Sequence, residues 1–333
     1  MSSATGIPQA VLDQLDPEYR AFIISTGITV QSPINETRWS PALRQAYLGT
    51  DTGSNQPMQV GSKRTTQLGD YSVQVMTPPG EKPSRGWPAV LNSHRGGWVL
   101  GDAGAEDVML SKICVNAQCV TVSVEYRLAP ENPFPVGLDD VWNALLWLSK
   151  EGEHELGIDN ERIAIMGGSA GGNLAAVVAQ RAALASPRIP LVYQALITPV
   201  IDTSFSADDR SRWTPSMVEH ENNWDLTVLE MLWFRDLYLP NVHDRTKPEA
   251  SPCYQEDKSA LEGMPPTWIS VAEVDTLRSE GEMYAEKLRT YGVPVTLKIL
   301  KGLPHTGIKC DRVCDQVRKH HDELVKALRK AFA

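Results

Sequence analysis

A serine between glycines stands near the middle of the chain, in the stretch Gly167-Gly168-Ser169-Ala170-Gly171. The stretch fits the pattern G-x-S-x-G, and it joins an apolar strand-like run to an alanine-rich helical run. A sharp turn at this junction would hold the serine hydroxyl clear of the backbone, with Gly167 and Gly171 leaving room where strand and helix nearly touch. A tight turn without chemistry is the alternative. In this setting the pattern favours Ser169 as a nucleophile.

A serine hydroxyl attacks poorly unless a general base takes its proton, and seven histidines are available. His305 comes just after the last strand-like run, at the sheet edge where ligands gather. We therefore expect His305 to be the base. His320 and His321 fall inside the last amphipathic helical pattern, and we expect them to be solvated.

The imidazole of such a base needs a carboxylate that fixes its tautomer. Asp275 directly follows the strand-like run TWISVAEV, and Glu273 lies two residues earlier on the same face of an extended chain. We prefer Asp275 because it falls at the start of a loop. The resulting chain order of serine, acid and histidine is one that catalytic triads use.

A developing oxyanion needs backbone N–H donors that no side chain blocks. The stretch NSHRGGWVLGD follows the strand-like run WPAVLN and contains Gly96 and Gly97. Their N–H groups, with that of Ala170 behind the nucleophile, could form an oxyanion hole. Paired glycines taken alone would indicate only an ordinary turn.

Short apolar runs rich in β-branched residues recur from residue 63 onward, and we interpret them as buried strands. They are YSVQVM, WPAVLN, QCVTVSVEY, RIAIMG, LVYQALIT, TWISVAEV and VTLKIL. Several are separated by helical patterns, namely GLDDVWNALLWLSKEG, GGNLAAVVAQRAALA, SEGEMYAEKLRTYG and DQVRKHHDELVKALRKA. This alternation predicts a mostly parallel sheet with helices on both faces.

A strand-free insertion interrupts this alternation before TWISVAEV, and we expect it to form a helical lid continuous in space with N-terminal helices. The predicted boundaries are 1–60 for N-terminal cap helices, 61–202 and 251–333 for the two parts of the core, and 203–250 for the cap insertion. The insertion carries aromatic side chains that either line a pocket or form core: Trp213, Trp224, Trp233 and Phe234.

The overall composition excludes several classes of partner. The net charge of −9 argues against nucleic acid or an anionic membrane surface. No apolar run reaches membrane-spanning length, and the first residues lack the features of a secretory signal. The five cysteines form an odd number without finger-like spacing, so we expect reduced thiols in the cytosol rather than disulfides or a metal site.

Four stretches jointly resemble motifs of the hormone-sensitive-lipase-like (GDXG) esterases of the α/β-hydrolase superfamily. HRGGW resembles the oxyanion loop HGGG-W/F, and VEYRLAPENPFPVGLDD resembles YRLAPE-x-PFPA-x-x-D. GGSAGGN resembles the nucleophile turn GDSAGGN, and VDTLRSEGEMYAEKL with GLPHTG resembles the ends that carry acid and histidine. The likeness runs from about residue 70 to the C-terminus.

This resemblance implies an α/β-hydrolase fold, with a mostly parallel eight-stranded sheet, helices on both faces and a helical cap. It assigns the acid to Asp275 rather than Glu273. Three departures bear on substrate choice. Arg95 replaces the first glycine of the oxyanion loop, Gly168 replaces the aspartate before the nucleophile, and Thr306-Gly307 replaces Gly-Phe after the histidine.

These features together predict a cytosolic serine carboxylic-ester hydrolase that acts on a small apolar or aromatic ester or lactone, with no cofactor or metal. The substrate would meet Trp98 and the four lid aromatics. Arg95 would either form a salt bridge away from the site or recognise an electron-rich substrate group. Two alternatives stay open: the same triad used for acyl transfer, elimination or cyclisation in specialised metabolism, and a non-catalytic ligand receptor. A homodimer is also left open.

Overall fold

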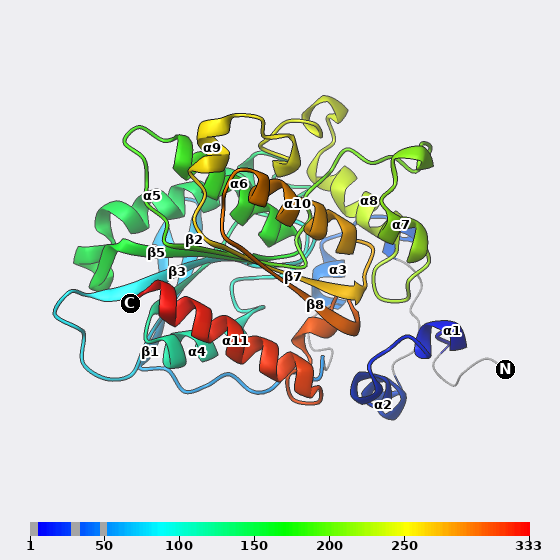
Figure 1. Cartoon of the computed structure of the whole chain (residues 1–333), viewed down its shortest axis with the longest axis horizontal. Coiled ribbons are helices and arrows are strands. Elements are labelled where there is room, and N and C mark those ends of the chain that lie inside the picture. The colour runs from blue at the N-terminus through cyan, green and yellow to red at the C-terminus, as the bar shows by residue number, and fades with distance from the viewer. Residues whose placement is uncertain (1–5, 28–33, 47–51) are drawn as a thin grey trace.

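Eight strands form one sheet in the order β1-β2-β4-β3-β5-β6-β7-β8 (Figure 1). The computed structural model describes residues 6–27, 34–46 and 52–333. The pairs of β2 with β1 and β4 are antiparallel, and all other pairs are parallel. The expected eight-stranded, mostly parallel sheet is confirmed. Its strands are β1 (Ser62–Leu68), β2 (Tyr71–Thr77), β3 (Trp87–Ser93), β4 (Val120–Glu125), β5 (Ile158–Gly168), β6 (Tyr193–Ile197), β7 (Thr267–Val274) and β8 (Val295–Pro304).

The burial of each strand follows from its place in the sheet. Every residue of β3 and β6 is buried, because helices cover both faces of the parallel part. The edge strand β1 is mostly exposed and carries the sequence SKRTTQL. Such a polar, charged edge discourages pairing with another chain. It also lacks the apolar pattern by which the other seven strands are found in the sequence.

Helices cover both faces of the sheet, as expected (Figure 1). One apolar cluster joins the sheet to α5, α6 and α10, and a second joins its other face to α4 and α11. The sequence patterns locate four of these helices but not α4. The bounds are α4 (Asp107–Ala117), α5 (Val136–Leu156), α6 (Ala170–Leu184), α10 (Arg278–Thr290) and α11 (Asp315–Ala331).

The expectation that His320 and His321 are solvated is wrong. Both side chains are 5% exposed, because they follow the buried Val317 by three and four residues and so share its face of α11. His320 packs against the ring of Trp268, with centroids 5.5 Å apart. His321 Nε2 lies 3.1 Å from the carbonyl oxygen of Ile308.

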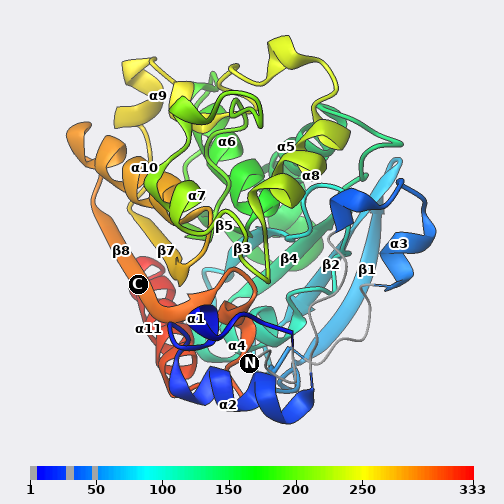
Figure 2. The same ribbon diagram turned by 90° about the vertical axis from the view of Figure 1, so that its right-hand side faces the viewer.

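Three α-helices lie between β6 and β7: α7 (Pro215–Glu219) and α8 (Val228–Tyr238) in the expected insertion, and α9 (Lys258–Glu262) after it. The N-terminal elements divide between two places (Figure 2). The turn between α1 (Gln9–Leu12) and α2 (Pro17–Thr26) binds β8 and α11 through Asp16, whereas η1 (Ile34–Glu36) donates from its first N–H to Glu230 of α8. The four domain boundaries stay a prediction.

Among the described residues, every helix is too short or too polar to cross a lipid bilayer.

We expect the buried His320 to make the protein less stable in acid. Burial lowers the pKa of His320 from 6.5 to about 3, and the neighbouring His321 and Lys298 add to the shift. Between these two values the unfolded chain binds a proton that the folded chain does not. The free energy of unfolding therefore falls as the pH drops below 6.5, by at most about 1.4 kcal/mol per pH unit.

His320→Leu should weaken this pH dependence. Urea unfolding at pH 7 and pH 5 should show a smaller loss of stability for the variant than for the wild type, by up to about 2 kcal/mol. The exposed His243 provides the matched control, since His243→Leu should keep the wild-type loss. An equal loss in the wild type and His320→Leu would contradict the role assigned to His320.

Candidate active site

Ser169 occupies a strained turn between β5 and α6. Its φ of 52° and ψ of −120° lie in a region that non-glycine residues rarely adopt. A Cβ atom at Gly167 would collide with the carbonyl of Gly171, so neither strand nor helix has room for a side chain here. The Ser169 N–H donates to the carbonyl of Ile197 at 2.9 Å, which fixes the turn on β6.

His305 connects Ser169 to Asp275 in one chain of contacts. Its Nε2 lies 2.9 Å from Ser169 Oγ, and its Nδ1 lies 2.8 Å from Asp275 Oδ2. The three residues follow or end β5, β7 and β8, whose carboxyl ends share one edge of the sheet. All three are buried, with Ser169 7%, His305 6% and Asp275 0% exposed.

The two candidate acids have different partners. Glu273 forms an ion pair with Lys301 at 2.7 Å and accepts the N–H of Gly302 at 2.8 Å, so its carboxylate is engaged away from His305. Asp275 lies beyond the end of β7, and its second oxygen accepts the N–H of Leu277 at 3.0 Å. This geometry favours Asp275 as the partner of His305.

The proposed oxyanion loop packs directly on the nucleophile turn. A Cβ atom at Gly171 would collide with the carbonyls of Ser93 and His94, and Ser93 Oγ donates to the Gly171 carbonyl at 2.7 Å. Gly96 and Gly97 have φ of 125° and 61°, which suit glycine. Within the part of the chain that the structure describes, the N–H groups of Gly96, Gly97 and Ala170 find no protein acceptor. Free donors beside a serine hydroxyl suit an anion.

Comparison with known proteins agrees with this geometry. A family model described as alpha/beta hydrolase fold matches residues 90–308. An AB hydrolase superfamily protein of Schizosaccharomyces pombe is 37% identical over 98% of this chain and 97% of its own length. This chain belongs to the hormone-sensitive-lipase-like group of the α/β-hydrolase superfamily.

One further comparison is with a protein named for its activity, and another is with a solved structure of the same fold. The carboxylic ester hydrolase LipN of Mycobacterium tuberculosis is 35% identical over 77% of this chain and 69% of its own length. The crystal structure of an alpha/beta hydrolase enzyme from the metagenome of Lake Arreo, Spain, matches with a TM-score of 0.83 and 28% identity, covering 96% of this chain and 99% of its own. The chain described here is therefore an enzyme of the carboxylesterase type.

Arg95 and Gly168, two departures from the motifs of the group, lie against each other. Arg95 Nε binds Glu106 Oε1 at 2.7 Å, with side chains 12% and 7% exposed. A Cβ atom at Gly168 would lie 3.0 Å from Arg95 Nη2, so the guanidinium occupies the space beside this glycine. Arg95 therefore forms a salt bridge, as one of the two expectations had it, but does so beside the nucleophile turn, and a role toward substrate stays a prediction.

The ion pair of Arg95 belongs to a buried charge cluster under the oxyanion loop. Burial raises the pKa of Glu106, but the positive charges of Arg95 and Lys309 outweigh it and lower the pKa to about 2. Burial lowers the pKa of Lys309, whose Nζ donates to the Ala105 carbonyl at 3.0 Å. Because these charges compensate one another, they hold the loop in place.

Helix α8 packs on the oxyanion loop through its aromatic side chains. The ring of Phe234 lies so close to Gly97 that a Cβ atom there would come within 2.5 Å of it. Trp98 is 2% exposed and stacks on Tyr238, with ring centroids 4.6 Å apart. Trp233 meets Phe234 edge to face at 5.1 Å. Phe234 is thus the lid aromatic with a direct contact to a proposed oxyanion donor.

The other two lid aromatics lie elsewhere. The Trp213 indole N–H donates to the Ser206 carbonyl at 2.7 Å, and the Arg210 guanidinium lies over its ring at 4.6 Å. Trp224 packs against the second apolar cluster, which also contains Tyr19 of α2, whereas Trp213 and Phe234 belong with the first. The four aromatics of the insertion therefore do not form a single wall.

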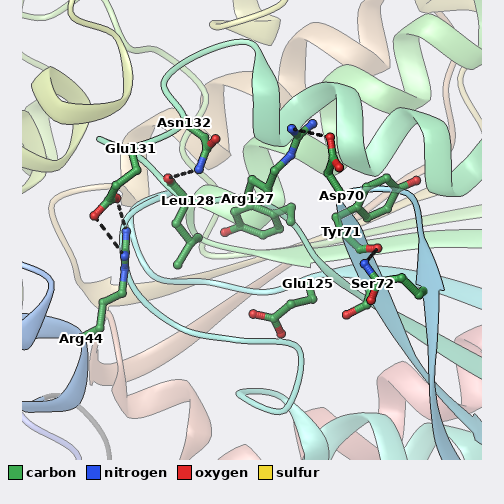
Figure 3. Close-up of a pocket in the computed structure, with 11 residues that line it drawn as sticks. Arg44, Asp70, Tyr71, Ser72, Glu125, Arg127, Leu128, Glu131 and Asn132 are labelled. Atoms are coloured by element: carbon green, nitrogen blue, oxygen red, sulfur yellow. Dashed lines mark hydrogen bonds and ion pairs between the residues drawn. The ribbon is translucent and has the colours of Figure 1, made fainter.

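A polar hollow of about 380 Å³ lies near the ends of β1, β2 and β4. Figure 3 shows the residues that line it. Arg44 binds Glu131 at 2.6 Å, and Arg127 binds Asp140 at 2.7 Å. Both cations are therefore committed to protein partners, and no triad residue lines the hollow. The lining residues are Arg44, Gln67, Asp70, Tyr71, Ser72, Glu125, Tyr126, Arg127, Leu128, Glu131 and Asn132.

Two buried carboxyl groups near the triad were not among the site residues expected from the sequence, although Glu280 lies in the stretch VDTLRSEGEMYAEKL. Burial raises the pKa of Glu280 to about 8, and this group accepts the N–H groups of Ile201 and Asp202 where the insertion begins. Asp225 accepts two hydrogen bonds from Thr306, the residue after His305. Glu280 thus fixes the segment just before the insertion, and Asp225 joins the lid to the loop that carries His305.

We expect Arg95 to act mainly on stability. Arg95→Met should lower the free energy of unfolding by about 3 kcal/mol, because Glu106 then stays buried with only Lys309 to compensate its charge. The double variant Arg95→Met/Glu106→Gln should recover most of that loss in urea unfolding. Esters with and without a negative charge should be affected alike in kcat/KM. A double variant as unstable as Arg95→Met, or a loss confined to acidic esters, would contradict this role.

Proposed function

We propose that this hydrolase cleaves a small ester or lactone through an acyl-enzyme on Ser169. The observation that carries the proposal is the unbroken contact from Ser169 Oγ through His305 to Asp275, at 2.9 and 2.8 Å. A nucleophile, a base and an orienting carboxylate in this order are the parts that acyl transfer needs.

Acylation would begin when His305 Nε2 takes the proton of Ser169 and the freed oxygen attacks the ester carbonyl. The negative charge would move to the carbonyl oxygen, where the N–H groups of Gly96, Gly97 and Ala170 can receive it. Ala170 is also the first residue of α6, so the positive end of the helix dipole favours the same charge. Collapse of this intermediate would release the alcohol, which receives its proton from His305.

Deacylation would repeat these steps with water in place of the serine. His305 takes a proton from the water, whose oxygen attacks the acyl carbonyl. The intermediate then collapses, Ser169 Oγ leaves with the proton from His305, and the acid is released. Asp275, which contacts His305 Nδ1, would stabilise the imidazolium in both halves. This scheme requires no metal and no cofactor.

The substrate class follows from the contacts of the oxyanion loop. Phe234, with Trp233 against it, brings an apolar surface to Gly97, and the triad itself is almost fully buried. These contacts favour a small apolar or aromatic ester or lactone over a charged or polymeric substrate. The free thiols of all five cysteines support a cytosolic location. A homodimer stays a prediction.

A second candidate keeps the acyl-enzyme but transfers the acyl group to an alcohol. The observation that favours it is the low exposure of Ser169 and His305, which limits access for water. Mass spectrometry of the products formed with and without added alcohol distinguishes transfer from hydrolysis.

Ser169→Ala should abolish turnover without unfolding the protein. Loss of the nucleophile should lower kcat for a p-nitrophenyl ester by several powers of ten. The wild type should show a rapid burst of p-nitrophenol equal to the enzyme concentration, and the variant should show none. Ser25→Ala, a change of an exposed serine in α2, is the matched control. If Ser169→Ala kept more than about a hundredth of the wild-type kcat, the proposed function would be wrong.

Asp275→Asn should keep the fold but hold His305 in the wrong tautomer, and kcat should fall by about 10³–10⁴. Glu273 lies at the same strand end, but its carboxylate binds Lys301 rather than His305. Glu273→Gln should therefore keep kcat near the wild-type value. Measurement of both variants with one ester tests the assignment. A crippled Glu273→Gln beside an active Asp275→Asn would reverse it.

A further inference from the structure

The lid is joined to the strand end that presents the acid. Asn223 Nδ2 donates to the carbonyl of Val274 at 2.6 Å, and His220 Nε2 lies 3.1 Å from the carbonyl of Glu273. Both carbonyls belong to the last two residues of β7, directly before Asp275. The loop that follows α7 therefore holds one side of the acid–base pair.

The same lid loop also reaches the histidine side through Asp225. The Thr306 N–H donates to Asp225 Oδ2 at 2.6 Å, and the Thr306 hydroxyl donates to Asp225 Oδ1 at 2.7 Å. One hydrogen bond thus goes to each carboxylate oxygen, from the residue that directly follows His305. Two hydrogen bonds from one residue to both oxygens of one carboxyl group restrain the backbone that carries the imidazole.

The carboxyl group of Asp225 is surrounded by charged and polar groups of the site. Burial raises its pKa and the charge of Asp275 adds to this, whereas the hydrogen bonds from Thr306 and the charge of His305 lower it. Tyr19 of α2 is 3% exposed and lies beside both Asp225 and Thr306. Packed groups on several sides leave the carboxylate little freedom to move away from Thr306.

Thr306 is one of the positions at which this chain departs from the motif of its group, which has glycine there. Glycine would offer the N–H but no hydroxyl, so the second bond to Asp225 depends on the threonine side chain. The threonine that replaces glycine at position 306 therefore supplies the hydroxyl that binds the Asp225 carboxylate of the lid.

We propose that Asp225 and Thr306 form a positioning pair that ties the lid to His305. The pair touches none of the reacting atoms and acts only through the placement of the imidazole. Because Asp225 belongs to the lid, displacement of the lid would release Thr306, and the triad would lose its aligned base. The triad is then aligned for catalysis only when the lid is closed. This role rests on the proposed function of the triad.

Asp225→Ala tests the pair most directly. We expect kcat for a p-nitrophenyl ester to fall about tenfold to a hundredfold, because a displacement of a catalytic group by about 1 Å costs that much. KM should stay within about twofold, since Asp225 contacts Thr306 rather than the oxyanion loop. Glu221→Ala is the matched control: Glu221 lies in the same loop, but its carboxylate binds Arg210 at 2.5 Å. It should keep the wild-type kcat.

Two substitutions at Thr306 separate positioning from folding. Thr306→Val keeps the side-chain shape but loses the hydroxyl bond, and kcat should fall several-fold. Thr306→Ser keeps the hydroxyl and should restore kcat to near the wild-type value. The double variant Asp225→Ala/Thr306→Val should be no slower than Asp225→Ala alone, since both changes break the same contact. If Asp225→Ala does not fold, the two Thr306 variants still decide the matter.

A fluorophosphonate probe gives a readout that needs no ester substrate. Ser169 Oγ forms a bond to phosphorus, fluoride leaves, and His305 takes the serine proton. The labelling rate should fall in Asp225→Ala in parallel with kcat. A wild type that neither hydrolyses esters nor reacts with the probe would overturn the proposed function, and this role with it. A reactive wild type with an equally reactive Asp225→Ala would overturn the positioning role alone. The same conclusion would follow if Glu221→Ala or Thr306→Ser were as slow as Asp225→Ala.

Discussion

The close approach of β5 to the first turn of α6 is the constraint on which the rest of the site depends. The two backbones meet at Gly167 and Gly171, where no side chain fits. This approach leaves Ser169 in a left-handed conformation that costs about 1–3 kcal/mol and needs support from its surroundings. The Ser169 N–H bond to Ile197 and the packing of the β3 loop on Gly171 supply that support. Nucleophile and oxyanion donors are therefore placed by one steric contact.

A second constraint is the burial of charge beneath the oxyanion loop. In the motif of the group an aspartate precedes the serine and a glycine follows the first histidine of the loop, whereas this chain has Gly168 and Arg95. The structure explains why the two changes occur together, because the Arg95 guanidinium takes the space that Gly168 leaves open. Glu106 then balances the added charge, so the substitution alters the support of the loop and leaves its glycines in place.

The sequence could predict the parts of the site that depend on the sheet. Residues that follow parallel strands must meet at one edge, which is why the sequence alone predicts that Ser169, Asp275 and His305 lie together. The apolar period also located β7 and α11 within their observed bounds. It did not find β1, whose exposed residues have no apolar pattern, or the burial of His320 and His321. The spacing of both histidines from Val317 places them on one helix face, but their contacts with Trp268 and with the Ile308 carbonyl are tertiary and leave no local pattern.

The contact of Asp225 with Thr306 shows the limit of such reasoning most clearly. The two residues are 81 positions apart, and each belongs to an irregular loop rather than to a strand or helix. Local patterns place each loop near the carboxyl edge of the sheet, but the choice of a bonding partner depends on how the lid settles on the core. Asn223, His220 and Asp225 all belong to one short stretch, and their partners lie at the end of β7 and in the loop that carries His305. The lid is therefore better understood as part of the frame that aligns the acid and the base than as a cover added over a finished site.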